Sequence, residues 1–258
     1  MAVAAKLLDT DEAFSKAEFI VHGAWLPRVW WHCLFHSGFS LFHSSFVRMP
    51  HGAFDPVRLG YHGWKKRLVG PIERWLLRRA SKVLATCEAE RRWILAYEPR
   101  AKVEVVDLKQ YFKFVDAKIP TATAAKAGDG NVSLKLLYLG RIHPLKGIDY
   151  LKAAVDEVNR KFSNLPNFRP LELRVVSDAV GEDKERAWKW CDLLVLPTLS
   201  ENFRLVIAEA LARGIPVLTT DGAPAWSDTP GVTVLAGFRA AAPAVRVEML
   251  VSALQSLA

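Results

Sequence analysis

The sequence predicts an α/β protein with parallel sheets, and three observations support that fold class. Short, wholly apolar runs such as 193–196 and 215–218 are typical of strands that are buried on both faces. The segment between these runs, 200–213, is rich in Leu, Val, Ile and Ala and has the length of a helix. Gly214 then provides a helix stop. A strand, a helix and a second strand in this order form the βαβ unit of a parallel sheet.

Further elements follow the same pattern along the chain. In the first half, strands are expected at 19–21, 46–48, 83–85 and 103–106. In the second half, strands are expected at 134–139, 171–176, 193–196, 217–219 and 232–234. Helical stretches separate them, including one that begins near Ile148, one that contains Trp188 and Trp190, and a last one at 245–257.

A linker divides the chain into two lobes. Residues 119–131 contain two glycines and few large apolar side chains, which is typical of a flexible connection. The expected lobes are therefore 1–118 and 132–258, and 258 residues suffice for two modest domains. Both lobes read as α/β, and we expect a ligand in the cleft between them.

Two glutamates, Glu201 and Glu209, mark the helix between the strands at 193–196 and 217–219. Glu201 is expected to open that helix, and Glu209 lies inside its apolar sequence, where a carboxylate needs a partner. One interpretation is a surface ion pair of Glu209 with Arg213, worth about 0.3–0.5 kcal/mol. The other is a ligand site, in which the amides of Asn202 and Phe203 bind a phosphate at the helix N-terminus. Glu209, about 9–10 Å farther along, would then accept ribose hydroxyls.

A second loop points to the same kind of ligand. The strand at 134–139 ends in Gly140-Arg141-Ile142-His143-Pro144-Leu145-Lys146-Gly147, and open α/β sheets bind ligands at the carboxyl ends of their strands. Arg141 can grip phosphate oxygens in a bidentate fork, whereas Lys146 supplies a point charge. The alternative is an ordinary solvated basic loop.

These motifs resemble the GT-B glycosyltransferases of family 4. The likeness runs from about residue 18 to residue 237, and it rests on the loop at 140–147, on Leu196-Pro197-Thr198-Leu199-Ser200-Glu201-Asn202-Phe203 and on the spacing of the two glutamates. Shorter matches lie at 22–25, 50–56, 65–67, 78–80, 86–90 and 219–224. The resemblance implies two Rossmann-like lobes with a donor cleft between them. It also implies a retaining, metal-independent transferase that moves a sugar from a UDP-, GDP- or ADP-linked donor to an acceptor hydroxyl, with no other cofactor.

The resemblance also implies roles for particular residues. Glu201 and His51 would be catalytic, and His22, Gly23, Asp221, Gly222 and Ala223 would lie on the acceptor or sugar side. The donor would be bound by Arg141, Lys146, Asn202, Phe203, Arg204 and Glu209. Any one of the seven histidines could instead serve packing. No metal ligands are expected, because the one Asp-x-Asp sequence, Asp9-Thr10-Asp11, precedes a helical stretch and suits helix capping.

Several positions depart from the family pattern. The amino-terminal lobe is abbreviated, the acceptor side is therefore short, and Ala225 separates Pro224 from Trp226 in a loop expected near the sugar. Arg204 stands where the family has glycine, so it either adds a cation for the diphosphate or fills the pocket. The alternative function is accordingly a sugar-nucleotide-binding subunit or degenerate homologue that acts with a partner chain and does not turn over.

Composition bears on the partners and the compartment. The net charge of +8 favours an acidic partner, and the densest basic segment lies between Lys65 and Lys82, expected as an amphipathic helix from Pro71 onward. Such a helix suits an anionic membrane surface or a phosphorylated lipid acceptor, or it is simply a solvated face covering the core. No nucleic-acid-binding motif accompanies the charge. We expect a glycan or lipid-linked acceptor, as in lipopolysaccharide or capsule synthesis.

The rest of the composition is that of a folded, soluble enzyme. Hydrophobic residues make up 51% of the chain, which excludes a disordered protein, and no apolar run reaches the roughly 18 residues of a membrane span. The amino terminus lacks a signal-type apolar region. Cys33, Cys87 and Cys191 are widely spaced and expected to be reduced. These features predict a cytoplasmic protein, peripheral on the inner face of a membrane if the basic helix binds lipid.

Overall fold

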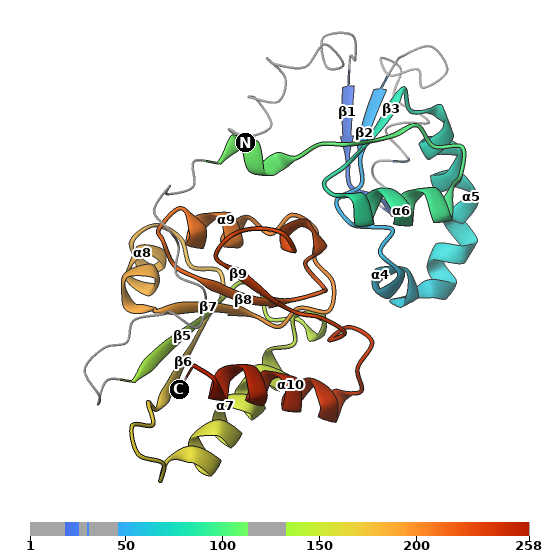
Figure 1. Cartoon of the computed structure of the whole chain (residues 1–258). Coiled ribbons are helices and arrows are strands. Elements are labelled where there is room, and N and C mark those ends of the chain that lie inside the picture. The colour runs from blue at the N-terminus through green and yellow to red at the C-terminus, as the bar shows by residue number, and fades with distance from the viewer. Residues whose placement is uncertain (1–18, 26–29, 31–45, 113–132, 258) are drawn as a thin grey trace. The chain divides into compact units, whose positions relative to one another are not determined.

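The computed structural model describes residues 19–25, 30, 46–112 and 133–257, which form two compact units (Figure 1). The division falls between Tyr111 and Phe112. The expected linker at 119–131 and the Asp9-Thr10-Asp11 sequence lie outside the described residues. The predicted fold class is confirmed, because each unit contains a parallel sheet flanked by helices.

The amino-terminal unit is built on four parallel strands in the order β1-β2-β3-β4. The strands are β1 (Phe19–His22), β2 (Phe46–Met49), β3 (Lys82–Ala85) and β4 (Val103–Val105), each within a residue or two of its expected place. The helices are α4 (Pro56–Gly60), α5 (Gly63–Arg79) and α6 (Glu88–Tyr97), followed by the 3-10 turn η1 (Leu108–Tyr111). Phe46, Leu76, Leu77, Val83 and Ile94 form the centre of its apolar core.

The structure corrects the basic helix expected between Lys65 and Lys82. Helix α5 begins at Gly63, eight residues before Pro71, and Pro71 lies inside it. Its last residue is Arg79, and Lys82 belongs to strand β3, where its ammonium pairs with Glu104 at 2.6 Å. Proline is common in the first turn of a helix, which is why the sequence predicts a start at Pro71. The interior of α5 nevertheless accommodates it, because tertiary packing supports the flanking turns.

The carboxyl-terminal unit contains five parallel strands in the order β6-β5-β7-β8-β9. These are β5 (Leu134–Leu139), β6 (Leu171–Val176), β7 (Leu193–Leu196), β8 (Val217–Thr220) and β9 (Val232–Leu235). Strands β5, β7 and β8 are almost wholly buried, as apolar runs in a parallel sheet require. All five strand predictions are confirmed.

Helices cover both faces of this sheet. In Figure 1, α7 (Ile148–Phe162) and α10 (Pro243–Gln255) lie on one face, and α8 (Gly181–Trp190) and α9 (Leu205–Leu211) lie on the other. Short 3-10 turns, η3 (Pro144–Lys146) and η4 (Pro224–Trp226), lie in the loops after β5 and β8. The chain moves from β5 to β6 and then back past β5 to β7, so the winding direction reverses between β5 and β7.

Helix α9 is shorter than the sequence predicted. It begins at Leu205 and ends at Leu211, so Glu201 lies in the preceding loop and does not open the helix. Asn202 and Phe203 lie in the same loop, and their amides are not first-turn helix amides. The segment 200–204 does not adopt helical geometry, because Glu201 bonds to Gly222 and Lys146 in neighbouring loops.

Candidate active site

The predicted phosphate-binding loops meet where the winding of the carboxyl-terminal sheet reverses. The loop 140–147 follows β5 and the loop 197–204 follows β7, and these two strands are neighbours in the sheet. Crevices at such reversal points are where open α/β sheets bind ligands, because the helices depart to opposite faces there. The backbone carbonyl of Leu145 joins the loops by accepting hydrogen bonds from Leu199 N at 2.8 Å and Thr198 Oγ1 at 3.1 Å.

Glycine is required at both ends of the first loop. Gly140 has φ +148°, and a Cβ at this position would overlap the guanidinium of Arg204. Gly147 has φ +65°, and a Cβ there would overlap the backbone carbonyl of Pro197. These two close approaches pack the loop 140–147 against the loop 197–204. Lys146 can therefore reach Glu201 in the second loop.

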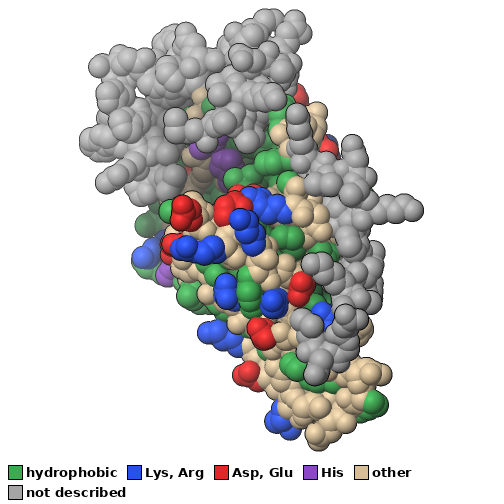
Figure 2. All heavy atoms as spheres, turned by 90° about the vertical axis from the view of Figure 1, so that its left-hand side faces the viewer, with side chains coloured by type: hydrophobic (Ala, Val, Ile, Leu, Met, Phe, Trp, Pro, Cys, Tyr) green, Lys and Arg blue, Asp and Glu red, His purple; other side chains and the backbone are tan. Residues whose placement is uncertain are grey.

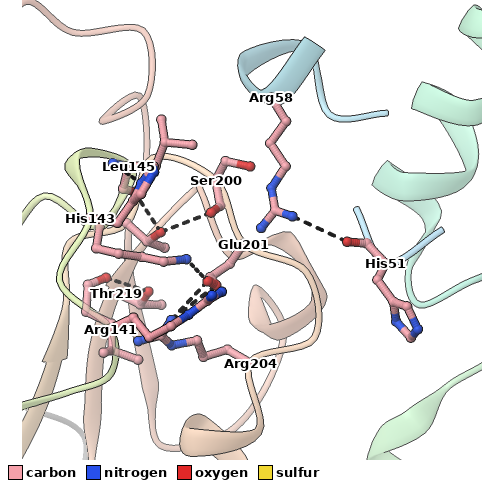
Figure 3. Close-up of polar contacts among 12 residues, drawn as sticks. His51, Arg58, Arg141, His143, Leu145, Ser200, Glu201, Arg204 and Thr219 are labelled. Atoms are coloured by element: carbon pink, nitrogen blue, oxygen red, sulfur yellow. Dashed lines mark hydrogen bonds and ion pairs between the residues drawn. The ribbon is translucent and has the colours of Figure 1, made fainter. Parts of the chain in front are cut away.

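Glu201 is buried between two cations. Glu201 is only 7% exposed. Its carboxylate forms an ion pair with the Lys146 ammonium and accepts hydrogen bonds from Arg204 Nη1 at 2.9 and 3.3 Å. Figure 3 shows Arg204 beside Glu201. A carboxylate with two partners remains ionised in a buried place. The cluster of Lys146, Glu201 and Arg204 therefore carries a formal charge of one positive unit.

Arg204 lies across the end of strand β5. Its Nη2 donates to the Leu139 carbonyl at 3.0 Å, and the guanidinium covers Gly140. The sequence left open whether this arginine adds a cation or fills a pocket. The structure places it in the wall of a cleft with one nitrogen on Glu201 and another on the backbone, so the side chain occupies space and also brings a positive charge there.

Glu209 pairs with a residue that the sequence analysis missed. Lys184 in the first part of α8 approaches the Glu209 carboxylate at 2.7 Å, whereas Arg213 donates to the Glu209 backbone carbonyl at 3.0 Å and pairs with Glu185 at 2.5 Å. The expected Glu209–Arg213 ion pair is therefore not formed. The position of Lys184 shortly after β6, on the same edge of the sheet as Arg141, was the signal that could have found it.

A cleft of about 360 Å³ brings these groups together. Its wall includes Arg141, Lys184, Arg204 and Glu209. The Arg141 side chain is exposed, and the structure records no ion pair between it and any described residue. Three cations and two carboxylates, those of Glu209 and Asp178, thus line one crevice, an arrangement suited to a ligand with anionic and hydroxyl groups.

Because α9 begins at Leu205, the distance along the helix from its first residue to Glu209 is shorter than the sequence predicts. From Leu205 to Glu209 is about 6 Å along the helix axis, shorter than the 9–10 Å expected from a helix beginning near Glu201. Both the loop after β5 and helix α9 contribute to the wall of the cleft. Phe203 points its ring toward Trp226, with ring centroids 4.8 Å apart, so this side chain packs in the loop.

The loop after β8 supports Glu201 from the other side. Gly222 accepts a hydrogen bond from Glu201 N at 2.8 Å, and a Cβ on Gly222 would overlap the Thr198 carbonyl. Ala223 is buried in this loop. The Asp221 carboxylate accepts hydrogen bonds from the amides of Gly237 at 3.1 Å and Arg239 at 2.9 Å, which fixes the turn after β9.

The two predicted histidines of the amino-terminal unit also come together. His22 Nδ1 lies 2.9 Å from His51 Nε2, and their rings stack with centroids 5.2 Å apart. Burial and, to a smaller extent, the neighbouring His22 together lower the pKa of His51 to about 4. His51 is therefore neutral near pH 7, so one ring nitrogen of the pair donates and the other accepts. Gly23, at φ +80°, donates its amide to the Met49 carbonyl at 2.8 Å.

A buried glutamate fixes the His51 loop. His51 has φ +57°, an unfavourable backbone conformation for a residue with a side chain. The carboxylate of Glu90 accepts hydrogen bonds from Gly52 N, from Thr86 N at 2.8 Å and from Thr86 Oγ1 at 2.7 Å. The sequence assigns Glu90 no role of its own, because its partner Gly52 lies on a loop 38 positions away. Arg58 Nη1 also lies 3.5 Å from the His51 carbonyl (Figure 3).

The described residues contain neither a cluster of metal ligands nor a membrane-spanning helix. Within the described parts of the chain, no three His, Cys, Asp or Glu side chains gather closely enough to hold a metal ion. Among the helices in those parts, none has both the length and the apolar composition needed to cross a bilayer. Among the described residues on the face drawn in Figure 2, basic and acidic side chains are mixed.

Comparison with known families gives two matches on this chain. Residues 12–108 match the family described as Glycosyl transferase 4-like domain, and residues 171–258 match Glycosyl transferases group 1. Together the matches include His22, His51, Lys184, Glu201, Arg204 and Glu209. Among curated protein sequences, none matches this chain significantly.

Solved structures share the fold at low sequence identity. Sucrose-phosphate synthase from Thermosynechococcus elongatus superposes with a TM-score of 0.59 at 18% identity, covering 98% of this chain and 67% of its own. An α,α-trehalose-phosphate synthase (UDP-forming) from Burkholderia xenovorans, in complex with glucose-6-phosphate, gives 0.60 at 11%, covering 94% and 66%. Anabaena HepE in complex with UDP and glucose gives 0.50 at 15%, covering 82% and 62%. The chain thus spans about two thirds of the length of these proteins.

Proposed function

This chain belongs to the GT-B glycosyltransferases, and on that basis we propose that it transfers a sugar from a nucleotide-sugar donor to an acceptor hydroxyl. The observation that supports the proposal most strongly is the cleft of about 360 Å³ at the reversal point of the carboxyl-terminal sheet. It combines Arg141, Lys184, Arg204 and Glu209, the charges that a nucleoside diphosphate and its ribose would need.

The donor would bind with its diphosphate near the loop after β5 and its ribose near α9. Arg141 would contact the phosphate oxygens first. Its side chain is exposed, and it forms no ion pair with any residue that the structure describes. Arg204 would add a second cation, and Lys146 would act behind it through Glu201. Glu209 would accept the ribose hydroxyls, and Lys184 would hold its carboxylate in place. The amides of Asn202 and Phe203 lie in a loop, so they would contribute only as loop donors.

The chemical step would proceed with retention. The acceptor oxygen forms a bond to the anomeric carbon on the face from which the nucleoside diphosphate leaves, and the carbon–oxygen bond to the phosphate breaks. The acceptor proton passes to the departing phosphate oxygen, so no separate protein base is needed. Cations that face the departing diphosphate stabilise its growing negative charge in the transition state. Metal independence is part of the same proposal.

Glu201 and His51 would position and polarise the reacting groups. Glu201 would approach the donor sugar and phosphate, and its two cationic partners keep it ionised. His51 is neutral near pH 7, so it would offer the acceptor or the sugar a hydrogen bond without a charge. His22, Gly23, Asp221, Gly222 and Ala223 would contribute to the acceptor or sugar side mainly by shaping the loops around these two residues.

The acceptor would be a glycan or lipid-linked saccharide of a cell-surface polymer such as lipopolysaccharide or capsule. Helix α5 carries Lys65, Lys66, Arg67, Arg74, Arg78 and Arg79, so it would let a cytoplasmic protein bind the anionic inner face of a membrane. No role with nucleic acid is proposed.

A second function is favoured by one observation. Both Lys146 and Arg204 contact the Glu201 carboxylate, which leaves little of it available to a substrate in this arrangement. A sugar-nucleotide-binding subunit that acts with a partner chain would show the same cleft without turnover. The variant Glu201→Ala separates the two functions, because an enzyme should lose turnover while it still binds the nucleotide.

The first test is a panel of UDP-, GDP- and ADP-sugars, followed by thermal shift and by release of the nucleoside diphosphate. Stabilisation by one nucleotide class, lost in Arg141→Ala and Glu209→Ala, would support the donor site. Glu157→Ala is the matched control for the lost carboxylate, because Glu157 is partly exposed on α7, pairs with Lys161 and lies outside the cleft. Release on addition of a glycan extract would support the transferase. No response to any nucleotide would refute both functions.

A further inference from the structure

A larger cavity of about 740 Å³ lies wholly within the amino-terminal unit. Its wall combines three aromatic rings with three cations: Trp25, Trp64, Tyr97, Lys66, Arg67 and Arg74. No carboxylate is among the described residues that line it. Cavities of this size hold small molecules, and their few polar groups decide which ones.

Two of the cations in this cavity, Lys66 and Arg74, lie against aromatic rings and have no acidic partner among the described residues. Lys66 donates to the Arg58 carbonyl and lies 5.8 Å from the centre of the Trp25 ring. Arg74 stacks on Tyr97 at 4.6 Å. Within the described parts of the chain, neither side chain forms an ion pair, and Arg67 forms none either. The nearby Arg48 is the opposite case, because it is fully buried and paired with Glu73.

This arrangement leaves the positive charge of the cavity uncompensated. Partial burial lowers the pKa of Lys66, and the neighbouring Arg58 lowers it in the same direction. An anion bound between Lys66 and the two arginines would relieve both effects. Guanidinium groups bind phosphate oxygens through paired N–H donors, so phosphate suits Arg67 and Arg74 better than a diffuse negative surface does.

The remaining wall suits a ring attached to that anion. Trp25 is held by two hydrogen bonds, from its amide to Glu73 Oε1 at 2.7 Å and from its ring nitrogen to the Ala53 carbonyl at 3.1 Å. Tyr97 donates to the Gly70 carbonyl at 3.3 Å, and a side chain at Gly70 would press on the Tyr97 hydroxyl. Glycines also occur at 60 and 63 in the lining, which leaves room beside the rings. Fixed aromatic faces offer apolar contact for the C–H face of a sugar.

We propose that this cavity binds a phosphate-bearing saccharide, with the phosphate on Lys66, Arg67 and Arg74 and the sugar against the aromatic rings. The phosphate belongs either to a free sugar phosphate or to a lipid-linked sugar. Trp64 and Leu68, which are 69% and 77% exposed on the same helix, would lie toward the hydrocarbon in the second case. That this saccharide is the acceptor rests on the proposed function.

The test measures binding of two probes to the full chain by calorimetry and by flotation. Glucose 1-phosphate represents the free source, and polyprenyl-phosphate-linked glucose in phosphatidylcholine vesicles represents the lipid source. We expect one of the two to bind at least about tenfold more tightly than unphosphorylated glucose or plain vesicles. Phosphatidylserine vesicles control for attraction to any anionic surface. Preference for the soluble probe identifies the free source, and binding of the vesicle probe alone identifies the lipid source.

The double variant Lys66→Gln, Arg74→Gln should weaken that binding at least about tenfold. Arg78→Gln is the matched control, because Arg78 lies one turn after Arg74 on α5, is exposed and does not line the cavity. Absence of binding to both probes would overturn the proposal, as would an equal loss in the Arg78 variant or equal binding to phosphatidylserine.

Donor binding in the carboxyl-terminal cleft serves as the independent readout. The Lys66 and Arg74 variants should keep the thermal shift caused by a nucleotide-sugar, which also shows that they fold. If nucleotide-sugars bind and neither probe does, the cavity proposal fails and the transferase proposal stands. If a probe binds in the cavity and no nucleotide-sugar binds, the proposed transferase fails and the phosphate site stands.

Discussion

Acid should destabilise this protein through His51. The pKa of this buried imidazole is about 4 in the folded protein, against an ordinary value of 6.5, because burial and the stacked His22 both oppose its charged form. Between these two values the unfolded chain takes up the proton more readily than the folded chain. The contribution to stability is therefore fully present above about pH 6.5 and decreases as the pH falls toward 4.

The size of the effect follows from the difference between the two pKa values. The difference between the ordinary pKa of 6.5 and the folded pKa of about 4 corresponds to a loss of about 3.5 kcal/mol when the pH falls below both values. Such a loss is a large part of the stability of a typical domain. The matched variant is His51→Asn, because asparagine tolerates the positive φ of this position better than most residues do.

Two measurements test this prediction. Urea unfolding followed by tryptophan fluorescence should show a steeper loss of stability between pH 6.5 and pH 4 for the natural protein than for His51→Asn. Histidine proton resonances should include one that titrates near pH 4 and is missing in the variant. The reasoning is refuted if the His51 resonance titrates near 6.5, or if both proteins lose stability equally over that range.

Three other predictions follow from the packing of the carboxyl-terminal unit. Glu201→Ala should destabilise the protein more than Lys146→Ala in urea unfolding, because the first leaves two cations without their carboxylate and the second leaves Glu201 paired with Arg204; the opposite order would contradict the assigned cluster. Gly147→Ala should cost at least about 1 kcal/mol more than Gly214→Ala, since both have positive φ but only the first meets a carbonyl, and equal costs would contradict the contact. Cys191, whose pKa burial raises to about 12, should resist alkylation near pH 8 until the protein unfolds, as peptide mapping would show; fast labelling of the folded protein would disprove this.

Local patterns were sufficient for the strands and for the loops that end them. Apolar runs such as 134–139 and 193–196 fall on β5 and β7 without a shift, because a strand buried on both faces has to be apolar throughout. The same patterns misplaced the start of α9. Residues 201–204 have no local signal against a helix, but Glu201 bonds to Gly222 in the next loop and to Lys146 in an earlier one, and these contacts hold the segment out of the helix.

Residue types predicted the charges of the candidate site but not their pairing. Arg141 and Glu201 could be singled out because loops at strand ends are where α/β sheets expose polar groups, and Glu209 because a carboxylate in an apolar helix needs a partner. The partner of Glu209 is Lys184, 25 positions away, and the expected neighbour Arg213 bonds elsewhere. A cation four residues away on the same helix is only one of several possible partners for a carboxylate. Here Lys184 on α8 pairs with Glu209 instead of Arg213.

The sequence by itself determined the fold class, the places of the nine strands that the structure describes, and the family to which the chain belongs. Each of these depends on patterns within a few residues, on the apolar period or on short motifs. Only the tertiary structure decided that Arg204 covers Gly140, that His22 stacks on His51, and that Trp25 and Tyr97 line one cavity with the cations of α5. These contacts join segments far apart in the chain, and their existence depends on strand order and loop packing, which no local pattern specifies.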